Sequence, residues 1–401
     1  MSLRKKKVAI LHLINTRSVM RGPDFFYPIF LKEYLQYPST KFRLYLVLRT
    51  DSKDRLQQRL IEMGLPTENL IFLESVNNRF KKIIEWLQFL RVIIQYRFSI
   101  WMICSFRSPE EELFQVKTLR SITRMSGSKL IFVNTYALLP QAFRHQDKYE
   151  FEKRDRVKYG AYFSAIRFDA IYTWYQSFAD WAPTSTFFKY QPLIQVLESR
   201  FCDMQKFKPL EKKKWIVFAS ALESYKHPLT VVNAAIALEK THPEILVQWK
   251  FFIIGSGKMK EEIIEIIESK NLQNYIELIA GLSDISSIVN HSMCFVSAQK
   301  EENFPSLAMN ECMASGNAIV ARDVGRTSIF VHHHKNGILV DSDKDDAIEN
   351  GILEFVLMSE NKQLEMGKYS RELCESTHNP KNFIRQTETL WSKISGDVPK
   401  L

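Results

Sequence analysis

The stretch that decides the fold is residues 296–316, Val-Ser-Ala-Gln-Lys-Glu-Glu-Asn-Phe-Pro-Ser-Leu-Ala-Met-Asn-Glu-Cys-Met-Ala-Ser-Gly. An apolar strand ends in an acidic loop, Pro305 lies where a helix would begin, and Gly316 follows the end of that helix. A proline at the start and a glycine after the end are typical helix boundaries. We therefore expect a helix whose N-terminus, from Ser306 and Leu307 onward, offers backbone N–H groups to a phosphate.

Strands and helices alternate along almost the whole chain on both sides of this stretch. Short β-branched or aromatic runs are followed by longer amphipathic segments, the pattern of βαβ units and parallel sheets, so the expected fold class is α/β with doubly wound sheets. The expected strands are 7–14, 42–48, 69–73, 99–104, 129–133, 170–174, 215–219, 250–254, 276–279, 293–296, 318–321 and 337–340. The expected helices are 25–36, 55–63, 79–97, 110–125, 228–240, 258–270, 284–291, 306–315 and 345–358.

The chain length predicts two domains. Its 401 residues exceed the ~250–300 residues at which a single hydrophobic core usually stops growing. The apolar pattern is interrupted at 205–214, which is typical of a linker. We predict Rossmann-like domains at 1–205 and 206–380, and a C-terminal helix in 381–401 for which a return to the first domain is left open. Two such domains would leave a cleft at the carboxyl ends of their strands, where open α/β sheets bind ligands.

The positive charge is confined to the first half of the chain. Residues 1–209 contain 34 Lys and Arg against 19 Asp and Glu, a net charge of +15, whereas the remainder contains 21 against 26, a net charge of −5. Such a half favours an anionic partner, namely a membrane surface, a phosphorylated acceptor or nucleic acid, unless the charge serves only to solvate the surface. Because no nucleic-acid-binding module is recognisable, we expect no nucleic-acid partner.

Cysteine spacing and hydropathy bear on the compartment. The five cysteines are scattered without a C-x-x-C pair, which argues against a zinc site and against a disulfide framework. No apolar run reaches the ~18 residues of a spanning helix, and the basic start of the chain leads into a strand rather than a cleavage site. We expect a cytoplasmic protein, with peripheral attachment at the inner face of the membrane left open and the oligomeric state undetermined.

The segment 79–97 is basic and carries two apolar stripes. One stripe suffices for packing on a sheet, and it comprises Phe80, Ile83, Ile84, Leu87, Leu90 and Ile94. The other could pack against a neighbouring helix or lie in a membrane interface, and it comprises Trp86, Phe89, Ile93 and Tyr96. Core packing is the expectation for both stripes.

The block at 296–316 resembles the donor-site signature of retaining GT-B glycosyltransferases of family 4, the glycosyl transferases group 1. In that signature a loop Glu and a helix Glu bracket a Phe-Pro element ahead of a Met-Ala-x-Gly helix end. Other segments agree with the family in order and spacing, namely 200–209, 218–228, 253–257, 323–325 and 336–340. The resemblance extends from about residue 200 to the C-terminus and is architectural before that. It implies two Rossmann-like domains facing each other across a cleft.

The resemblance also implies roles for individual residues. The catalytic residues would be Glu302, which contacts the transferred sugar, and Lys226, which neutralises the donor diphosphate, while Glu311 would hold the ribose hydroxyls. A Lys ammonium aimed at a leaving group that gains negative charge lowers the barrier electrostatically. We therefore expect neither a metal nor a cofactor, and we interpret the D-x-D sequence at 341–343 as an acidic turn.

Further donor contacts are expected around these three residues. They are Asn303, Phe304, Pro305, Ser306, Leu307, Gly255, Gly22, Arg322 and Arg326. Glu302 and Glu311 lie nine residues apart where the family has eight, so either the loop carries one extra residue or Asn303 takes the first acidic role. The family commonly places an Arg five residues before the Lys, where this chain has Ala221, so Arg322 or Arg326 would supply the missing charge.

The expected function is that of a metal-independent, hexosyltransferase-type glycosyltransferase that retains anomeric configuration. It would move a sugar from a nucleotide-diphosphate sugar to a glycan, a lipid-linked molecule or another hydroxyl acceptor. His145 and Glu152 are candidate acceptor contacts because they lie in a polar stretch after an expected strand. The alternative is a non-catalytic GT-B protein that binds a sugar nucleotide or a partner, which Ala221 and the altered Glu spacing motivate.

Overall fold

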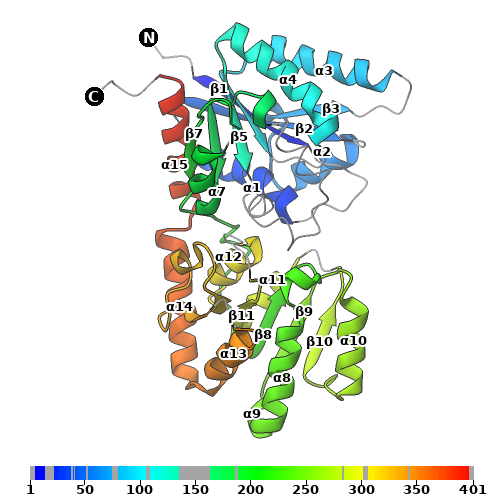
Figure 1. The fold of residues 1–401 in the computed structure, drawn as a ribbon, viewed down its shortest axis with the longest axis vertical. Coiled ribbons are helices and arrows are strands. Elements are labelled where there is room, and N and C mark those ends of the chain that lie inside the picture. Colours follow the sequence, from blue (N-terminus) through cyan, green and yellow to red (C-terminus); the bar gives the residue numbers. More distant parts are fainter. Residues whose placement is uncertain are drawn as a thin grey trace. The chain divides into compact units, whose positions relative to one another are not determined.

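The computed structural model divides the chain into two compact units (Figure 1). Unit 1 comprises Met1–Leu197 and Phe383–Leu401, and unit 2 comprises Glu198–Asn382. The structure describes residues 5–13, 22–37, 39, 41–50, 53–74, 80–104, 109–134, 163–185, 188–281, 284–300, 306–341 and 344–396. Among these residues, no helix combines the length and the apolar character that crossing a bilayer requires.

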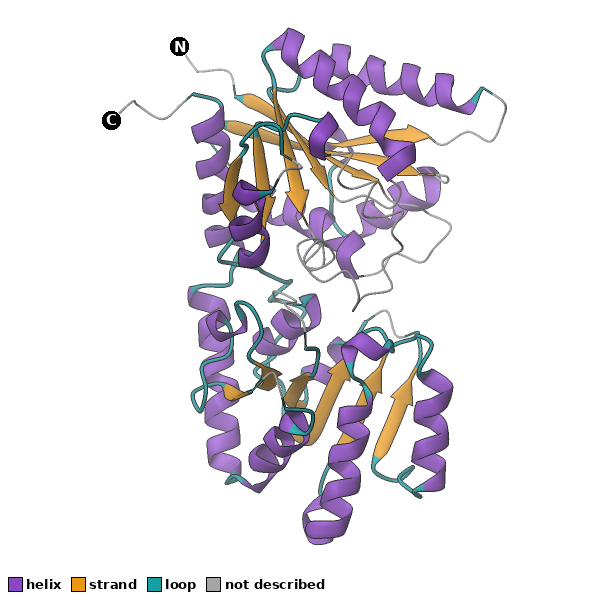
Figure 2. Ribbon diagram, in the orientation of Figure 1, coloured by secondary structure: helices purple, strands orange, loops and turns teal. Residues whose placement is uncertain are grey.

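Unit 1 is built on a parallel sheet with the strand order β3-β2-β1-β4-β5-β6-β7 (Figure 2). Its strands are β1 Lys6–Leu13, β2 Phe42–Thr50, β3 Leu70–Glu74, β4 Ile100–Cys104, β5 Lys129–Asn134, β6 Ala170–Thr173 and β7 Leu193–Val196. Its helices are α1 Gly22–Gln36, α2 Lys53–Glu62, α3 Lys81–Tyr96, α4 Pro109–Ser126, α7 Gln176–Trp181 and α15 Pro380–Ile394. Helices cover both faces of the sheet, so both sides of the central strands are buried and their sequences are continuously apolar. Val8, Ala9 and Ile10 of β1, for example, are almost fully buried.

The helix α15 packs on unit 1 although it follows unit 2 in the chain. Phe383 meets Phe26 and Phe30 edge to face, with ring centroids 5.4 and 5.1 Å apart. Trp391 is fully buried, and its indole N–H points at the sulfur of Met102 in β4, 3.2 Å away. The first unit therefore depends on residues that follow unit 2 for part of its core.

Unit 2 is built on a second parallel sheet with the strand order β10-β9-β8-β11-β12-β13. Its strands are β8 Lys213–Ala219, β9 Lys250–Ile254, β10 Ile276–Ile279, β11 Ser292–Ser297, β12 Ala318–Arg322 and β13 Gly337–Val340. Its helices are α8 Leu229–Thr241, α9 Pro243–Leu246, α10 Lys260–Ser269, α11 Ser286–Val289, α12 Leu307–Ala314, α13 Ala347–Leu357 and α14 Glu360–Ser376. The chain runs outward from β8 to β10 and then resumes on the other side at β11, so the sheet is doubly wound about the β8–β11 pair.

The predicted fold class is confirmed, and every expected strand is present. The strand β7 was not predicted, because it has only four residues, all half-buried at the sheet edge, and therefore lacks a clear apolar run. The helices α7, α9 and α14 were also not predicted. In α14 the buried positions include Gln363, Gly367 and Ser370, so its core-facing side is not apolar in sequence.

The expected orientation of α3 is wrong. The buried side chains of the helix are Glu85, Phe89, Val92 and Ile93, whereas Phe80, Ile83, Leu87 and Ile94 are exposed. The carboxylate of Glu85 pairs with the guanidinium of Arg49 on β2, which turns this side of the helix toward the sheet. The first stripe, expected to pack on the sheet, therefore lies largely on the exposed side, whereas Phe89 and Ile93 of the second stripe are buried.

Candidate functional site

The most distinctive polar contact in unit 2 joins two loops at the carboxyl ends of β8 and β11. Lys226 ends the short helix η3, Ser224–Lys226, in the loop after β8, and Gln299 lies two residues beyond β11. The ammonium of Lys226 donates a hydrogen bond to Oε1 of Gln299, which is buried. Because β8 and β11 flank the point where the strand order reverses, this cation lies where open α/β sheets bind ligands.

Two glycines hold the Lys226 loop against the loop after β9. A Cβ atom at Gly255 would lie 1.9 Å from the carbonyl oxygen of Ser220, and one at Gly257 would lie 2.3 Å from that of Leu222. Backbone hydrogen bonds run from Leu222 N to Ser256 O at 3.0 Å and from Met259 N to Leu222 O at 3.0 Å. Gly255, expected as a donor contact, thus has a packing role that positions the segment leading to Lys226.

This packing makes the substitution of Gly257 by Ala testable. We expect Gly257→Ala to lower the free energy of unfolding by about 1–3 kcal/mol, because the new methyl group overlaps backbone that cannot move without breaking the loop pairing. Urea unfolding followed by tryptophan fluorescence measures the change. The control is Ser256→Ala next to it, whose side chain is exposed; equal stability of the two variants would contradict the packing role.

The helix α12 begins where the sequence indicated. Ser306 is its N-cap, and the Ser306 hydroxyl accepts a hydrogen bond from the N–H of Met309 at 3.1 Å. The N–H groups of Leu307 and Ala308 belong to the first turn, where no carbonyl of the same helix can pair with them. Because α12 follows β11, this N-terminus lies at the same edge of the sheet as Gln299.

His227 follows Lys226 and lies among charges of both signs. The pKa of His227 is lowered by burial first and then by the charges of Arg322 and Lys300, while Asp345 opposes that shift. The ring is therefore neutral at pH 7, so it adds no positive charge beside Lys226.

Arg322, expected as a substitute phosphate contact, is almost fully buried at the end of β12. Its Nε donates to the carbonyl of Ala298 at 2.9 Å, and Nη1 and Nη2 donate to the carbonyls of Lys344 and Asp345 at 2.6 and 3.0 Å. The guanidinium thus fastens the loop after β11 to the segment before α13. This arrangement supports a structural role for Arg322.

A structural role predicts the effect of removing the guanidinium. We expect Arg322→Met to lower the free energy of unfolding by about 3 kcal/mol, because one buried and two partly buried hydrogen bonds are lost. The control variant is Lys335→Met, an exposed cation in the turn before β13, which we expect to change stability by less than about 0.5 kcal/mol. A stable Arg322→Met protein in a thermal unfolding assay would contradict this role.

Glu311 lies on α12 and is partly buried. Burial raises its pKa to about 7, and the charges of Lys206 and Arg200 oppose that rise. Lys206 in turn pairs with Asp284 at 3.1 Å. A carboxyl group that changes its charge near neutral pH can accept hydrogen bonds from sugar hydroxyls only when it is deprotonated.

The structure brings some of the predicted site residues to one edge of a sheet, and others lie elsewhere or outside the described residues. Lys226, Gly255, Ser306, Leu307 and Arg322 lie in loops or helix starts at the carboxyl edge of one sheet, or end a strand there. Arg326 precedes the short helix η4, Thr327–Ile329, and Gly22 begins α1 in unit 1. The remaining candidates lie outside the described residues, and they are Glu302, Asn303, Phe304, Pro305, His145 and Glu152.

Sequence reasoning did not assign roles to Gln299 and Gly257. Gln299 carried a weak signal, since it is a polar residue just after a buried strand, but its partner lies 73 positions away. Within the part of the chain that the structure describes, no group of three or more His, Cys, Asp or Glu side chains could hold a metal ion.

Residues 200–373 match the family model of glycosyl transferases group 1. The matched residues coincide with most of unit 2. One curated relative is the GtfA subunit of the UDP-N-acetylglucosamine–peptide N-acetylglucosaminyltransferase of Streptococcus agalactiae. It is 29% identical over 145 residues, which is 34% of this chain and 28% of the relative. The curated relatives that the chain matches are each covered over less than half of their own length.

Solved structures share the fold over nearly the whole chain. A glycosyltransferase from Rickettsia africae ESF-5 has a TM-score of 0.69 at 14% identity and covers 99% of this chain and 100% of its own. Anabaena Alr3699/HepE, solved in complex with UDP, has a TM-score of 0.68 at 12% identity and covers 97% of this chain and 100% of its own. Together with the two doubly wound sheets, these similarities identify the fold as GT-B.

Proposed function

We propose that the protein is a retaining glycosyltransferase that moves a sugar from a nucleotide-diphosphate sugar to a hydroxyl acceptor. The observation that carries the proposal is the Lys226–Gln299 contact at the strand reversal of a group 1 domain. Unit 2 would hold the donor, and unit 1, which contains most of the excess positive charge, would hold a glycan or lipid-linked acceptor. Family 4 membership and independence of metal ions are part of this proposal.

The proposed chemistry uses charges that the described residues supply. As the glycosidic bond to phosphate breaks, the leaving diphosphate gains negative charge, which the ammonium of Lys226 and the first-turn N–H groups of α12 would stabilise. Gln299 would keep Lys226 in place before the donor arrives. Glu311 would accept hydrogen bonds from the ribose hydroxyls, and Glu302 would contact the transferred sugar.

Uridine diphosphate is the first nucleotide to test, because the names of a relative and of a structural neighbour mention UDP or a UDP-sugar. We expect thermal unfolding to shift upward with UDP, since a ligand that binds only the folded state stabilises it. Release of UDP from UDP-sugars, with and without a panel of glycan acceptors, then measures turnover. A screen in which no nucleoside diphosphate raises the unfolding temperature would contradict the proposal.

The alternative is a non-catalytic protein of the same fold that binds a sugar nucleotide or a partner. Ala221, at the position where the family commonly has an Arg, favours this alternative because one phosphate-neutralising charge is missing. UDP binding without release of UDP from any UDP-sugar, at equal donor affinity in Glu302→Ala, would support the alternative. Loss of turnover in Glu302→Ala would support the enzyme.

A further inference from the structure

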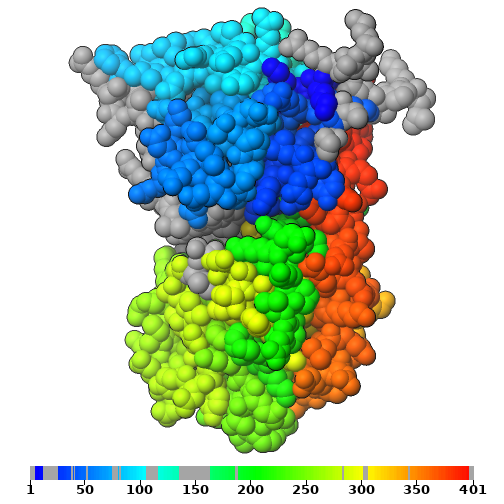
Figure 3. Space-filling view, turned by 180° about the vertical axis from the view of Figure 1, so that it is seen from behind, coloured from blue at the N-terminus to red at the C-terminus, as the bar shows by residue number. Residues whose placement is uncertain are grey.

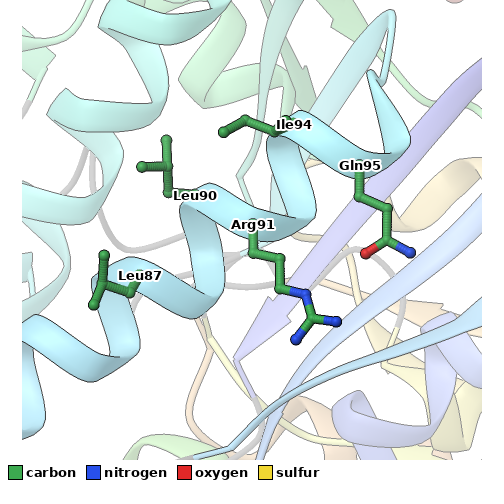
Figure 4. Close-up of a pocket in the computed structure, with 5 residues that line it drawn as sticks. All are labelled: Leu87, Leu90, Arg91, Ile94 and Gln95. Atoms are coloured by element: carbon green, nitrogen blue, oxygen red, sulfur yellow. The ribbon is translucent and has the colours of Figure 1, made fainter.

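We propose that the exposed face of α3 attaches unit 1 to an anionic lipid surface. The face is defined by Ile83, Leu87 and Ile94, which expose 58%, 52% and 63% of their surface. The helix has 16 residues. Leu87, Ile94 and the partly exposed Leu90 between them follow one side of it (Figure 4). Isolated exposed apolar residues are ordinary, but a row along one helix face marks an interaction surface.

The charges on the same helix favour an anionic occupant. Arg91 lines a shallow depression on the helix surface together with Leu87, Leu90 and Ile94, and its side chain extends along the flank on which Gln95 lies, away from Leu90 and Ile94 (Figure 4). The one carboxylate of α3, Glu85, is buried and paired with Arg49. The exposed face therefore combines apolar side chains with positive charge and carries no carboxylate of its own helix.

Tyr96 and Lys7 extend this character at the C-terminal end of the helix. The ring of Tyr96 is half-buried, and the ammonium of Lys7 lies 5.8 Å from its centroid. The adjacent Tyr45 is buried, and Arg43 over its ring pairs with the exposed Glu68, so these residues do not contribute to the face. Tyrosine rings and long basic side chains such as Tyr96 and Lys7 are enriched where a protein meets the headgroup region, because each has an apolar body and a polar end.

The dimensions of the face argue for a lipid surface rather than a protein partner. A helix of 16 residues is ~24 Å long and ~10 Å wide, so one side of it offers much less than the ~800 Å² per partner of a stable protein interface. A membrane-surface helix needs only an apolar strip that enters the acyl boundary and cations that meet the headgroups. The segment containing α3 and α4, cyan in Figure 3, forms an outer edge of unit 1.

Flotation of the full chain with vesicles tests this assignment. We expect the protein to float with vesicles of 70% phosphatidylcholine and 30% phosphatidylglycerol at 0.1 M NaCl. With vesicles of pure phosphatidylcholine it should stay in the bottom fraction. The double variant Leu87→Ser/Ile94→Ser should bind about tenfold less, because two side chains no longer enter the apolar region. Arg91→Gln should weaken binding severalfold and reduce its dependence on salt.

The control is the double variant Val247→Ser/Leu357→Ser. It replaces two apolar side chains of unit 2 that expose 64% and 48% of their surface. It should float like the parent, and circular dichroism should show that all variants are folded. Equal binding to neutral vesicles, no binding to anionic ones, or unchanged binding of Leu87→Ser/Ile94→Ser would overturn the proposal. So would a dimer in light scattering that this variant converts to monomer, because the face would then join two copies of the chain. The test requires no transferase activity and stands apart from the proposed function.

Discussion

Replacing Lys226 by Met is expected to lower kcat/KM for sugar transfer about a hundredfold, with little change in stability. The reason is that the ammonium would face a leaving diphosphate in a site of low dielectric constant, where removing one stabilising charge costs about 3 kcal/mol of transition-state energy. Steady-state release of nucleoside diphosphate measures the rate, and calorimetry with UDP measures binding. The side chain is half-buried in a loop, so the fold does not depend on it.

The chain offers a closely matched control for this variant. Lys214 also donates its ammonium to a glutamine, Oε1 of Gln248 at 2.7 Å, but it lies at the amino end of β8, the opposite edge of the same sheet. Lys214→Met removes the same charge and the same kind of hydrogen bond, and we expect it to leave kcat/KM within about twofold of the parent. If both variants lost activity equally, the carboxyl edge would not be the donor site.

Glu311→Gln is expected to stabilise the protein above neutral pH while it weakens donor binding. Because burial raises the pKa of Glu311 to about 7, the folded state binds this proton more tightly than the unfolded state, whose carboxyl has its ordinary pKa near 4.5. The stabilisation by the neutral carboxyl is present below about pH 4.5 and is lost as pH rises through 7. A glutamine stays neutral, so the variant should gain about 2 kcal/mol over the parent at pH 8.

The affinity for the donor, unlike the stability, should increase as Glu311 ionises. If the ionised carboxylate accepts hydrogen bonds from ribose hydroxyls, the KM of the parent for the donor should fall between pH 6 and pH 8. Glu311→Gln should raise KM about tenfold or more at pH 8 and remove this pH dependence. Glu354→Gln makes the same change on an exposed helical carboxylate and should affect neither quantity. A Glu311→Gln protein that is no more stable than the parent at pH 8, or that keeps the parental KM, contradicts the assignment.

The sequence was most informative where one local pattern admits one structure. Short continuous apolar runs such as Phe251–Ile254 are typical of strands buried on both faces. The Pro305 and Gly316 boundaries around α12 allowed its first residue to be predicted within one position. The family resemblance indicated Lys226, whose loop proved to adjoin the strand reversal. These predictions needed no knowledge of contacts distant in sequence.

Other features depend on such contacts and could not be predicted. A helix with apolar residues on two sides can face the sheet with either, and in α3 the choice follows the pairing of Glu85 with Arg49. Arg322 looked available for a phosphate because its three acceptor carbonyls are recognisable only in the folded chain. The role of Gln299 likewise becomes visible only when β8 and β11 lie side by side.

The return of α15 to unit 1 affects how the protein folds during synthesis. The ribosome synthesises all seven strands of the first sheet before it begins unit 2, yet Phe383 and Trp391, which pack on Phe30 and Phe42, are made only after unit 2. Domains generally fold as units as they emerge. The core of unit 1 would therefore remain incomplete and accessible to chaperones and proteases until α15 is made. By then unit 2 could already have folded.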